Sequence, residues 1–140
     1  MTTFGTAKWK GGLKDGKGEL STKSGALNDY PYGFASRFEG KPGSNPEELI
    51  GAAHAGCFTM ALSLILGEAG FTAEEMSTKA EITLEKQGEG FAITKSHLTL
   101  RAKIPGLTNG KFQELAGLAE KSCPVSKLLK AEISLDAALL

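Results

Sequence analysis

The sequence of 140 residues lacks several features that would assign a function class directly. Its formal net charge is zero, so a general attraction to nucleic acid or to an anionic membrane is not expected. The glycines form neither a GxGxxG pattern nor a P-loop after a strand, which leaves nucleotide binding without support. Close pairs of zinc ligands and HExxH-type helices are missing too. These absences argue against nucleic-acid, nucleotide and zinc proteins.

The N-terminus and the cysteine content bear on the cellular compartment. Lys8 and Lys10 are not followed by an apolar run, so a signal peptide is not expected and the cytosol is the default location. Cysteine is scarce, with Cys57 and Cys123 as its two occurrences. In the cytosol, two cysteines are more often reactive or metal-binding than a structural disulfide.

Length and composition are those of an ordinary globular domain. The chain is 41% hydrophobic and 23% charged, without repeats, low-complexity tracts or linkers. We therefore expect a single domain over residues 1–140, with a workable core that a second subunit would enlarge.

Hydrophobic patterning predicts an α+β fold whose strands pair in hairpins rather than in βαβ crossovers. A Gly/Pro-rich loop over residues 24–45 holds four aromatic residues around Arg37, and a short strand across Gly33–Phe38 is plausible there. The expected strands cover residues 3–10, 19–23, 76–85, 91–103 and 132–138, and the expected helices cover about 46–68, 108–122 and 125–129.

The helix expected over 46–68 organises the chain. Asn45 can cap it, Pro46 suits its first position, and Glu47 and Glu48 complement the helix dipole. From Leu49 to Leu66 apolar residues cover nearly every face, which predicts a helix buried on all sides. About 18 residues barely suffice to span a bilayer, and this run is diluted by glycine and polar residues, so a membrane span is disfavoured.

Cys57 and Cys123 are the sharpest candidates for chemistry. A cysteine reacts as the thiolate, and its pKa falls near a cation or a helix N-terminus. Cys123 stands directly before Pro124, at the expected N-cap of a new helical turn, which makes it the more acidic thiol on physical grounds. Cys57 lies about three turns inside its helix and needs a cation from elsewhere. Two unrelated buried cysteines remain the alternative.

Arg37 is the leading candidate for that cation, since no other arginine precedes Arg101. Simple cation–π packing among its aromatic neighbours is the alternative role. Glu47 lies about 15 Å from Cys57 along the helix axis, so it cannot touch that thiol within one straight helix. If Glu47 serves the thiol, it must hold a long side chain such as Arg37, or reach a cysteine of a second subunit; a helix-dipole role alone is the alternative and suffices for Glu48.

The two histidines have weaker claims. His54 lies one turn before Cys57, so a metal site with Cys57 and Cys123 is conceivable, but the ligand spacing is not that of a zinc site. His97 falls in a strand pattern and is expected to be a surface or interface residue.

Two stretches carry a recognisable pattern. The sequence from Asn45 to Phe58 (NPEELIGAAHAGCF) and the later Ser122-Cys123-Pro124-Val125-Ser126 closely resemble the OsmC family, the osmotically inducible relatives of the organic hydroperoxide resistance proteins. The loop around Arg37 and the N-terminal KWKGG also fit, and the resemblance covers essentially the whole chain. It implies long buried central helices packed against antiparallel sheets, in an intertwined homodimer with two active sites at the interface.

The resemblance also implies a chemistry. It makes the chain a cofactor-free thiol peroxidase that reduces organic hydroperoxides, and hydrogen peroxide less efficiently. Cys57 matches the peroxidatic cysteine, Cys123 the resolving cysteine that forms a disulfide with it, and Arg37 and Glu47 the pair that activates the thiolate. The family pattern thus names Cys57 as the attacking thiol, whereas helix-end acidity alone favours Cys123; a paired arginine can outweigh that modest effect.

The resulting interpretation is a cytosolic antioxidant enzyme of the oxidative and osmotic stress response, reduced by a dithiol or a lipoylated protein. No cofactor, metal, nucleic acid or membrane partner is expected. The rival is a non-enzymatic binding protein for small ligands or stress signals on the same scaffold, with structural cysteines.

Overall fold

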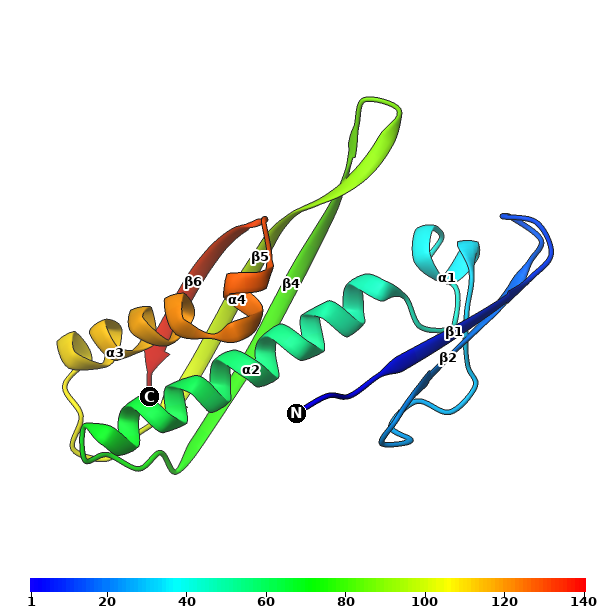
Figure 1. Cartoon of the computed structure of the whole chain (residues 1–140). Helices are drawn as coiled ribbons and strands as arrows, with labels where there is room; N and C mark the ends of the chain where they lie inside the picture. The colour runs from blue at the N-terminus through cyan, green and yellow to red at the C-terminus, as the bar shows by residue number, and fades with distance from the viewer. The chain divides into compact units, whose positions relative to one another are not determined.

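Residues 1–49 form the first of two units in a computed structural model that describes all 140 residues (Figure 1). Its sheet has the order β1-β2-β3, made of β1 (Gly5–Lys10), β2 (Lys17–Thr22) and β3 (Tyr30–Tyr32) in antiparallel register. The short β3 was not predicted. Gly18 in β2 lies under the edge-on pair of Trp9 and Tyr32, where a Cβ atom would overlap the Tyr32 ring. Glycine is therefore required there.

A helix replaces the strand that was plausible across Gly33–Phe38. This helix, α1 (Phe34–Phe38), is one turn long, and the Ser36 hydroxyl accepts a hydrogen bond from the Gly33 N–H at 2.9 Å. Ser36 also donates to the Ser44 carbonyl at 2.8 Å. The strand prediction was wrong because these side-chain hydrogen bonds favour a turn, which aromatic content alone does not reveal.

The second unit, residues 50–140, contains a sheet of order β4-β5-β6 with helices on one face (Figure 1). Strand β4 (Glu75–Gln87) pairs antiparallel with β5 (Gly90–Lys103), with a bulge between Thr83 and Leu84. Helix α3 (Asn109–Ser122) and the short α4 (Pro124–Leu128) then lead to β6 (Glu132–Leu139).

Strand β6 corrects one part of the predicted topology. It runs parallel to β5, with Lys95 opposite Glu132 and Ala102 opposite Leu139. The connection from β5 through α3 and α4 to β6 is therefore a helical crossover, because parallel neighbours cannot be joined by a tight hairpin. The α+β class is confirmed, but the strands do not all pair in hairpins.

Helix α2 (Pro46–Glu68) has the predicted limits and starts in the first unit. Asn45 Oδ1 accepts from the Glu48 N–H at 2.8 Å, as expected of an N-cap. Length and composition alone would allow α2 to cross a membrane, a test that core helices of soluble proteins also pass. Its buried residues recur every three or four positions: Gly51, His54, Phe58, Leu62 and Leu66. The last three of them join the core formed with β5 and α3.

The prediction that α2 is buried on all sides is wrong for the single chain. On its other face, Met60 and Leu64 retain 76% and 65% of their surface. The sequence pattern shows only that the helix is apolar all round; it does not say which faces one chain can cover.

Candidate active site

Arg37 and Glu47 form an ion pair in the first unit. The guanidinium of Arg37, at the end of α1, donates from Nε to both carboxylate oxygens of Glu47 at 3.0 and 3.2 Å, and from Nη2 to Oε1 at 2.6 Å. Two parallel N–H···O bonds of this kind fix a guanidinium in position. Glu47 thus holds Arg37, which was one of the two roles expected for it. Glu48, the next residue, is exposed and contributes its backbone N–H to the helix cap.

The same guanidinium packs on an aromatic ring. The Arg37 Cζ atom lies 5.3 Å from the centroid of the Phe38 ring, so cation–π packing accompanies the ion pair. Around it lies a pocket of about 290 Å³ that includes three of the four aromatic residues of the loop, and also Trp9 and Leu13 from outside it. The rest of its lining is Tyr32, Gly33, Phe34, Arg37 and Phe38. Phe58, the aromatic residue next to Cys57 in sequence, is a fully buried core residue.

Cys57 and Cys123 meet in the second unit. Cys57 projects from α2 and is partly exposed, while Cys123, between α3 and α4, is fully buried. Both are free thiols, and they lie within hydrogen-bonding reach of each other. Two thiols in contact are arranged to be joined by a disulfide once one of them is oxidised.

The surroundings of the two thiols shift their pKa values in opposite directions. Burial raises the pKa of Cys57, and its hydrogen bond with Cys123 raises it further, while the Val125 N–H acts against both. Burial alone would also raise the pKa of Cys123. The Cys57 thiol, the Ser126 N–H and hydroxyl, and the Val125 N–H outweigh that effect, so the pKa of Cys123 is lowered.

The position of Cys123 explains its acidity. It is the N-cap of α4 with Pro124 next, as the sequence predicted. Its sulfur makes no cap hydrogen bond of regular geometry, but the N–H groups at the start of α4 lie close enough to favour the thiolate. Within the second unit Cys123 is the more acidic thiol, in agreement with the expectation from helix-end acidity.

His54 does not form a metal site with the cysteines. Its Nδ1 atom lies 2.6 Å from Ser96 Oγ and its Nε2 atom lies 2.8 Å from Ser126 Oγ, so both ring nitrogens are hydrogen-bonded. No cluster of three or more His, Cys, Asp or Glu side chains is arranged to hold a metal ion. His97 is partly exposed and hydrogen-bonds Ser134 through Nδ1 at 2.5 Å, on the other face of the sheet.

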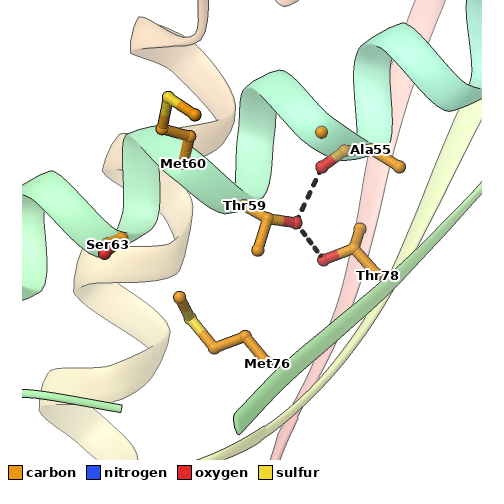
Figure 2. Close-up of a pocket in the computed structure, with 7 residues that line it drawn as sticks. Ala55, Thr59, Met60, Ser63, Met76 and Thr78 are labelled. Carbon is orange, nitrogen blue, oxygen red and sulfur yellow. Dashed lines mark hydrogen bonds between the residues drawn. The ribbon is translucent and has the colours of Figure 1, made fainter. Parts of the chain in front are cut away.

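A shallow apolar groove runs along the exposed side of α2, between that helix and β4 (Figure 2). The Thr59 side chain links the helix to the strand in this groove: its hydroxyl donates to the Ala55 carbonyl at 2.7 Å and lies 2.7 Å from Thr78 Oγ1. Met60 and Met76 supply thioether side chains from the helix and the strand. The volume is about 550 Å³, and the lining is mainly apolar.

Comparison with known proteins identifies the family. The model of the OsmC-like protein family matches residues 38–138. The chain belongs to the OsmC-like family. It is 56% identical over 132 residues to the peroxiredoxin OsmC of Escherichia coli, with 94% of this chain and 92% of that protein covered. It is 28% identical over 117 residues to the organic hydroperoxide resistance protein OhrB of Bacillus subtilis, with coverages of 83% and 84%.

Solved structures agree with the assignment to the OsmC-like family. The crystal structure of Bacillus subtilis OhrB superposes with a TM-score of 0.70 at 26% identity, over 100% of this chain and 98% of that one. An OsmC-like protein of unknown function from Vibrio cholerae superposes with a TM-score of 0.77 at 16% identity, over 99% of both chains, and supports the fold alone. The predicted OsmC-like fold is therefore confirmed.

Two serines of this OsmC-like chain were missed by the sequence analysis as functional candidates. Ser96 and Ser126 are buried and bracket His54, but they lie 42 and 72 residues from it in sequence. The spacing of Ser126, three residues after Cys123, was the one available signal, because an N-cap residue and the third helical residue face each other.

Proposed function

We propose that this protein is a thiol peroxidase that reduces organic hydroperoxides to alcohols, and hydrogen peroxide less efficiently. The observation that carries the proposal is the contact between two free thiols, Cys57 and Cys123, in a chain 56% identical to the peroxiredoxin OsmC of Escherichia coli. The name of the Bacillus subtilis relative, an organic hydroperoxide resistance protein, supports the same class of substrate.

The reaction has three steps. The Cys57 thiolate attacks one oxygen of the hydroperoxide, the O–O bond breaks, and the alkoxide leaves as the alcohol after taking a proton, so that Cys57 becomes a sulfenic acid. The Cys123 thiolate then displaces hydroxide from that sulfur, which forms the disulfide and releases water. A dithiol, either a small molecule or a lipoylated protein, finally donates two electrons and restores both thiols.

Arg37 and Glu47 are proposed to activate Cys57. The raised pKa of Cys57 within the second unit means that the attacking thiolate needs a positive partner. Arg37 is proposed to supply that charge to the sulfur and to the charge that develops on the peroxide oxygens, while Glu47 orients the guanidinium. The aromatic pocket beside Arg37 is proposed to take the organic part of the substrate.

A homodimer is proposed as the functional form. Strand β1 is exposed along its whole length, and the first unit buries hardly any side chain, so its sheet lacks a core of its own. A three-stranded sheet needs a packed apolar face to be stable. The apolar groove beside Met60 and the exposed Leu64 offer a complementary surface on α2. A second copy of the chain would cover these surfaces, and the cytoplasm is the proposed location.

Thiol counting tests the peroxidase proposal and its rival together. The reduced protein is treated with t-butyl or cumene hydroperoxide, and free thiols are followed with a chromogenic disulfide reagent. We expect the loss of two thiols per chain, one molecule of alcohol per chain, and full recovery after addition of dihydrolipoamide. A binding protein with structural cysteines would instead bind the hydroperoxide without losing thiols.

Single variants then assign the two thiols. Cys57→Ser should abolish hydroperoxide consumption, whereas Cys123→Ser should consume one equivalent and stop as a sulfenic acid that dimedone traps. If Cys57→Ser consumes hydroperoxide as fast as the parent, Cys57 is not the attacking thiol.

A further inference from the structure

A buried histidine that the proposed peroxidase chemistry does not use is connected to the resolving thiol. His54 in α2 has no exposed surface, and hydroxyl groups engage both of its ring nitrogens, Ser96 from β5 and Ser126 from α4. The Ser126 hydroxyl also lies near the Cys123 sulfur, where it lowers the pKa of that thiol. Ser96, His54 and Ser126 therefore form one hydrogen-bonded chain that starts at the sheet and ends beside the Cys123 thiol.

This chain has two consistent proton arrangements. A neutral imidazole carries one N–H, so one ring nitrogen donates and the other accepts. If Nε2 carries the proton, it donates to Ser126 Oγ, which leaves the Ser126 hydroxyl proton for the Cys123 sulfur, while Ser96 donates to Nδ1. If Nδ1 carries it, Ser126 must donate to Nε2 and can only accept a proton from a Cys123 thiol. The tautomer of His54 and the ionisation of Cys123 are thus linked.

The surroundings of His54 favour the neutral ring that this linkage requires. Burial lowers the pKa of His54, and no carboxylate lies against the ring to oppose that effect. The groups that face Cys123 are the Cys57 thiol from α2, the Val125 N–H, and the N–H and hydroxyl of Ser126 in α4. The nearby cations of α3 and α4, Lys121 and Lys127, are exposed to solvent.

We propose that His54 is a positioning residue for the Cys123 thiolate: its Nε2–H tautomer holds the Ser126 hydroxyl in the orientation that donates a hydrogen bond to the Cys123 sulfur. The hydrogen bond itself needs no peroxide; its effect on turnover rests on the proposed function. Cys123 attacks the Cys57 sulfenic acid as a thiolate. When a reductant thiolate attacks the Cys57 sulfur of the disulfide, the S–S electron pair departs on Cys123, so a stabilised thiolate leaves faster.

A thiolate titration tests the chain of hydrogen bonds directly. In a Cys57→Ala background only Cys123 titrates as a thiol, and its ionisation is followed by ultraviolet absorbance. Ser126→Ala should move the midpoint upward by about one pH unit, the size expected for losing one hydrogen bond to a charged group. His54→Leu should move it in the same direction, and His54→Gln should restore most of the shift, because its amide N–H replaces Nε2–H.

The other histidine–serine pair provides the matched control. His97→Gln and Ser134→Ala remove a comparable pair on the far face of the same sheet, and they should leave the Cys123 midpoint unchanged. The proposal is overturned if either Ser126→Ala or His54→Leu titrates like the background protein. Should His54→Leu fail to fold, the tautomer of His54 in the unmodified protein decides in its place.

A spectroscopic measurement on the unmodified protein adds a readout that a purely structural role would not give. The chain contains two histidines, so ¹⁵N shifts of the His54 ring nitrogens are assigned by comparison with His97→Gln. Above the midpoint of Cys123 the proton should reside on Nε2. An Nδ1–H tautomer beside an ionised Cys123 would contradict the proposal.

These outcomes separate the inference from the proposed function. If hydroperoxide consumes no thiols but Ser126→Ala and His54→Leu both shift the titration, the positioning role of His54 stands and the peroxidase proposal falls. If the peroxidase is active but neither variant shifts the titration midpoint of Cys123, the peroxidase proposal stands and the positioning role of His54 falls. If both hold, Ser126→Ala should also slow reduction of the preformed disulfide by a dithiol, and His54→Gln should slow it less than His54→Leu.

Discussion

Arg37 and Glu47 form a bidentate ion pair, with guanidinium nitrogens 2.6, 3.0 and 3.2 Å from the carboxylate oxygens. The pair joins the one-turn helix α1 to the first turn of α2, and the Arg37 side chain is about one-third exposed while that of Glu47 is 12% exposed. An isolated exposed ion pair adds little stability. We therefore expect its main consequence in chemistry, where it holds a cation in a fixed orientation.

Arg37→Lys tests that orientation. Lysine keeps the positive charge but cannot form two parallel hydrogen bonds to one carboxylate. We expect kcat/KM for t-butyl hydroperoxide to fall by about 10²-fold, the size typical of losing one preorganised donor to a developing oxyanion. Arg101→Lys, which alters the ion pair with Asp136 on the solvent-facing side of the sheet, is the control and should retain parental kinetics. Unchanged kinetics in Arg37→Lys would remove Arg37 from the activating pair.

Glu47→Gln and Glu48→Gln separate two adjacent carboxylates in the same helical turn. Glu47 holds the guanidinium, whereas Glu48 contributes only its backbone N–H to the cap and projects into solvent. Because both substitutions remove one negative charge near the helix N-terminus, their effects on helix stability should be similar. Steady-state peroxidase assays should show a fall of at least about tenfold in kcat/KM for Glu47→Gln alone. If kcat/KM falls equally in the two variants, the loss comes from the missing charge at the helix N-terminus and not from the contact between Glu47 and Arg37.

Met60→Asp and Leu64→Asp test the homodimer. Both side chains lie on the face of α2 that one chain leaves exposed, and a buried unpaired carboxylate in an interface costs several kcal/mol. Sedimentation velocity should show a dimer for the parent and a monomer for either variant. Leu118→Asp, on an exposed position of α3, is the control and should remain dimeric. A monomeric parent would refute the dimer proposal outright.

The buried His54 makes stability depend on pH. Its pKa is lowered by burial in the folded chain, whereas in the unfolded chain it returns to about 6.5. Below that pH the unfolded chain therefore binds a proton that the native state does not, and the free energy of unfolding decreases as pH falls. Urea denaturation between pH 7 and pH 5 should give a smaller decrease for His54→Gln than for the parent, and a parental decrease for His97→Gln. An identical decrease in all three proteins would contradict this account.

Gly51 allows α2 to lie close against β4. A Cβ atom there would lie 3.0 Å from the Ala80 carbonyl oxygen, a backbone atom within the sheet. At Gly67, in the same helix, a Cβ atom would meet nothing within 4 Å. Gly67→Ala should stabilise the protein by about 0.5–1 kcal/mol through helix propensity. Gly51→Ala should destabilise it by about 1–3 kcal/mol through overpacking, as measured by chemical denaturation. If Gly51→Ala stabilises the protein instead, the backbone of β4 at Ala80 must shift to make room for the added methyl group.

Local chemistry explains which parts of the fold were predictable. The limits of α2 follow from a capping asparagine, a proline at the first helical position and a long apolar run, all adjacent in sequence. The β4–β5 hairpin follows from alternation around a glycine turn. The parallel pairing of β5 with β6 was missed because it joins strands separated by two helices, and no local signal records it. The α1 turn was missed because Ser36 decides it through bonds to Gly33 and Ser44.

The candidate site divides in the same way. The residue types and the resemblance to a family singled out Cys57, Cys123, Arg37 and Glu47, and helix geometry alone showed that Glu47 cannot touch Cys57 along one helix. The sequence also determined that Cys123 caps a helical turn, since Pro124 follows it directly. Only the tertiary structure decided that the two thiols touch, that Glu47 holds Arg37, and that His54 connects Ser96 to Ser126. Propensity and capping act over a few neighbouring residues, whereas these contacts join residues that lie apart in sequence. The ion pair links α1 to the first turn of α2, and the thiol and histidine contacts depend on packing α2, α3 and the sheet around one core.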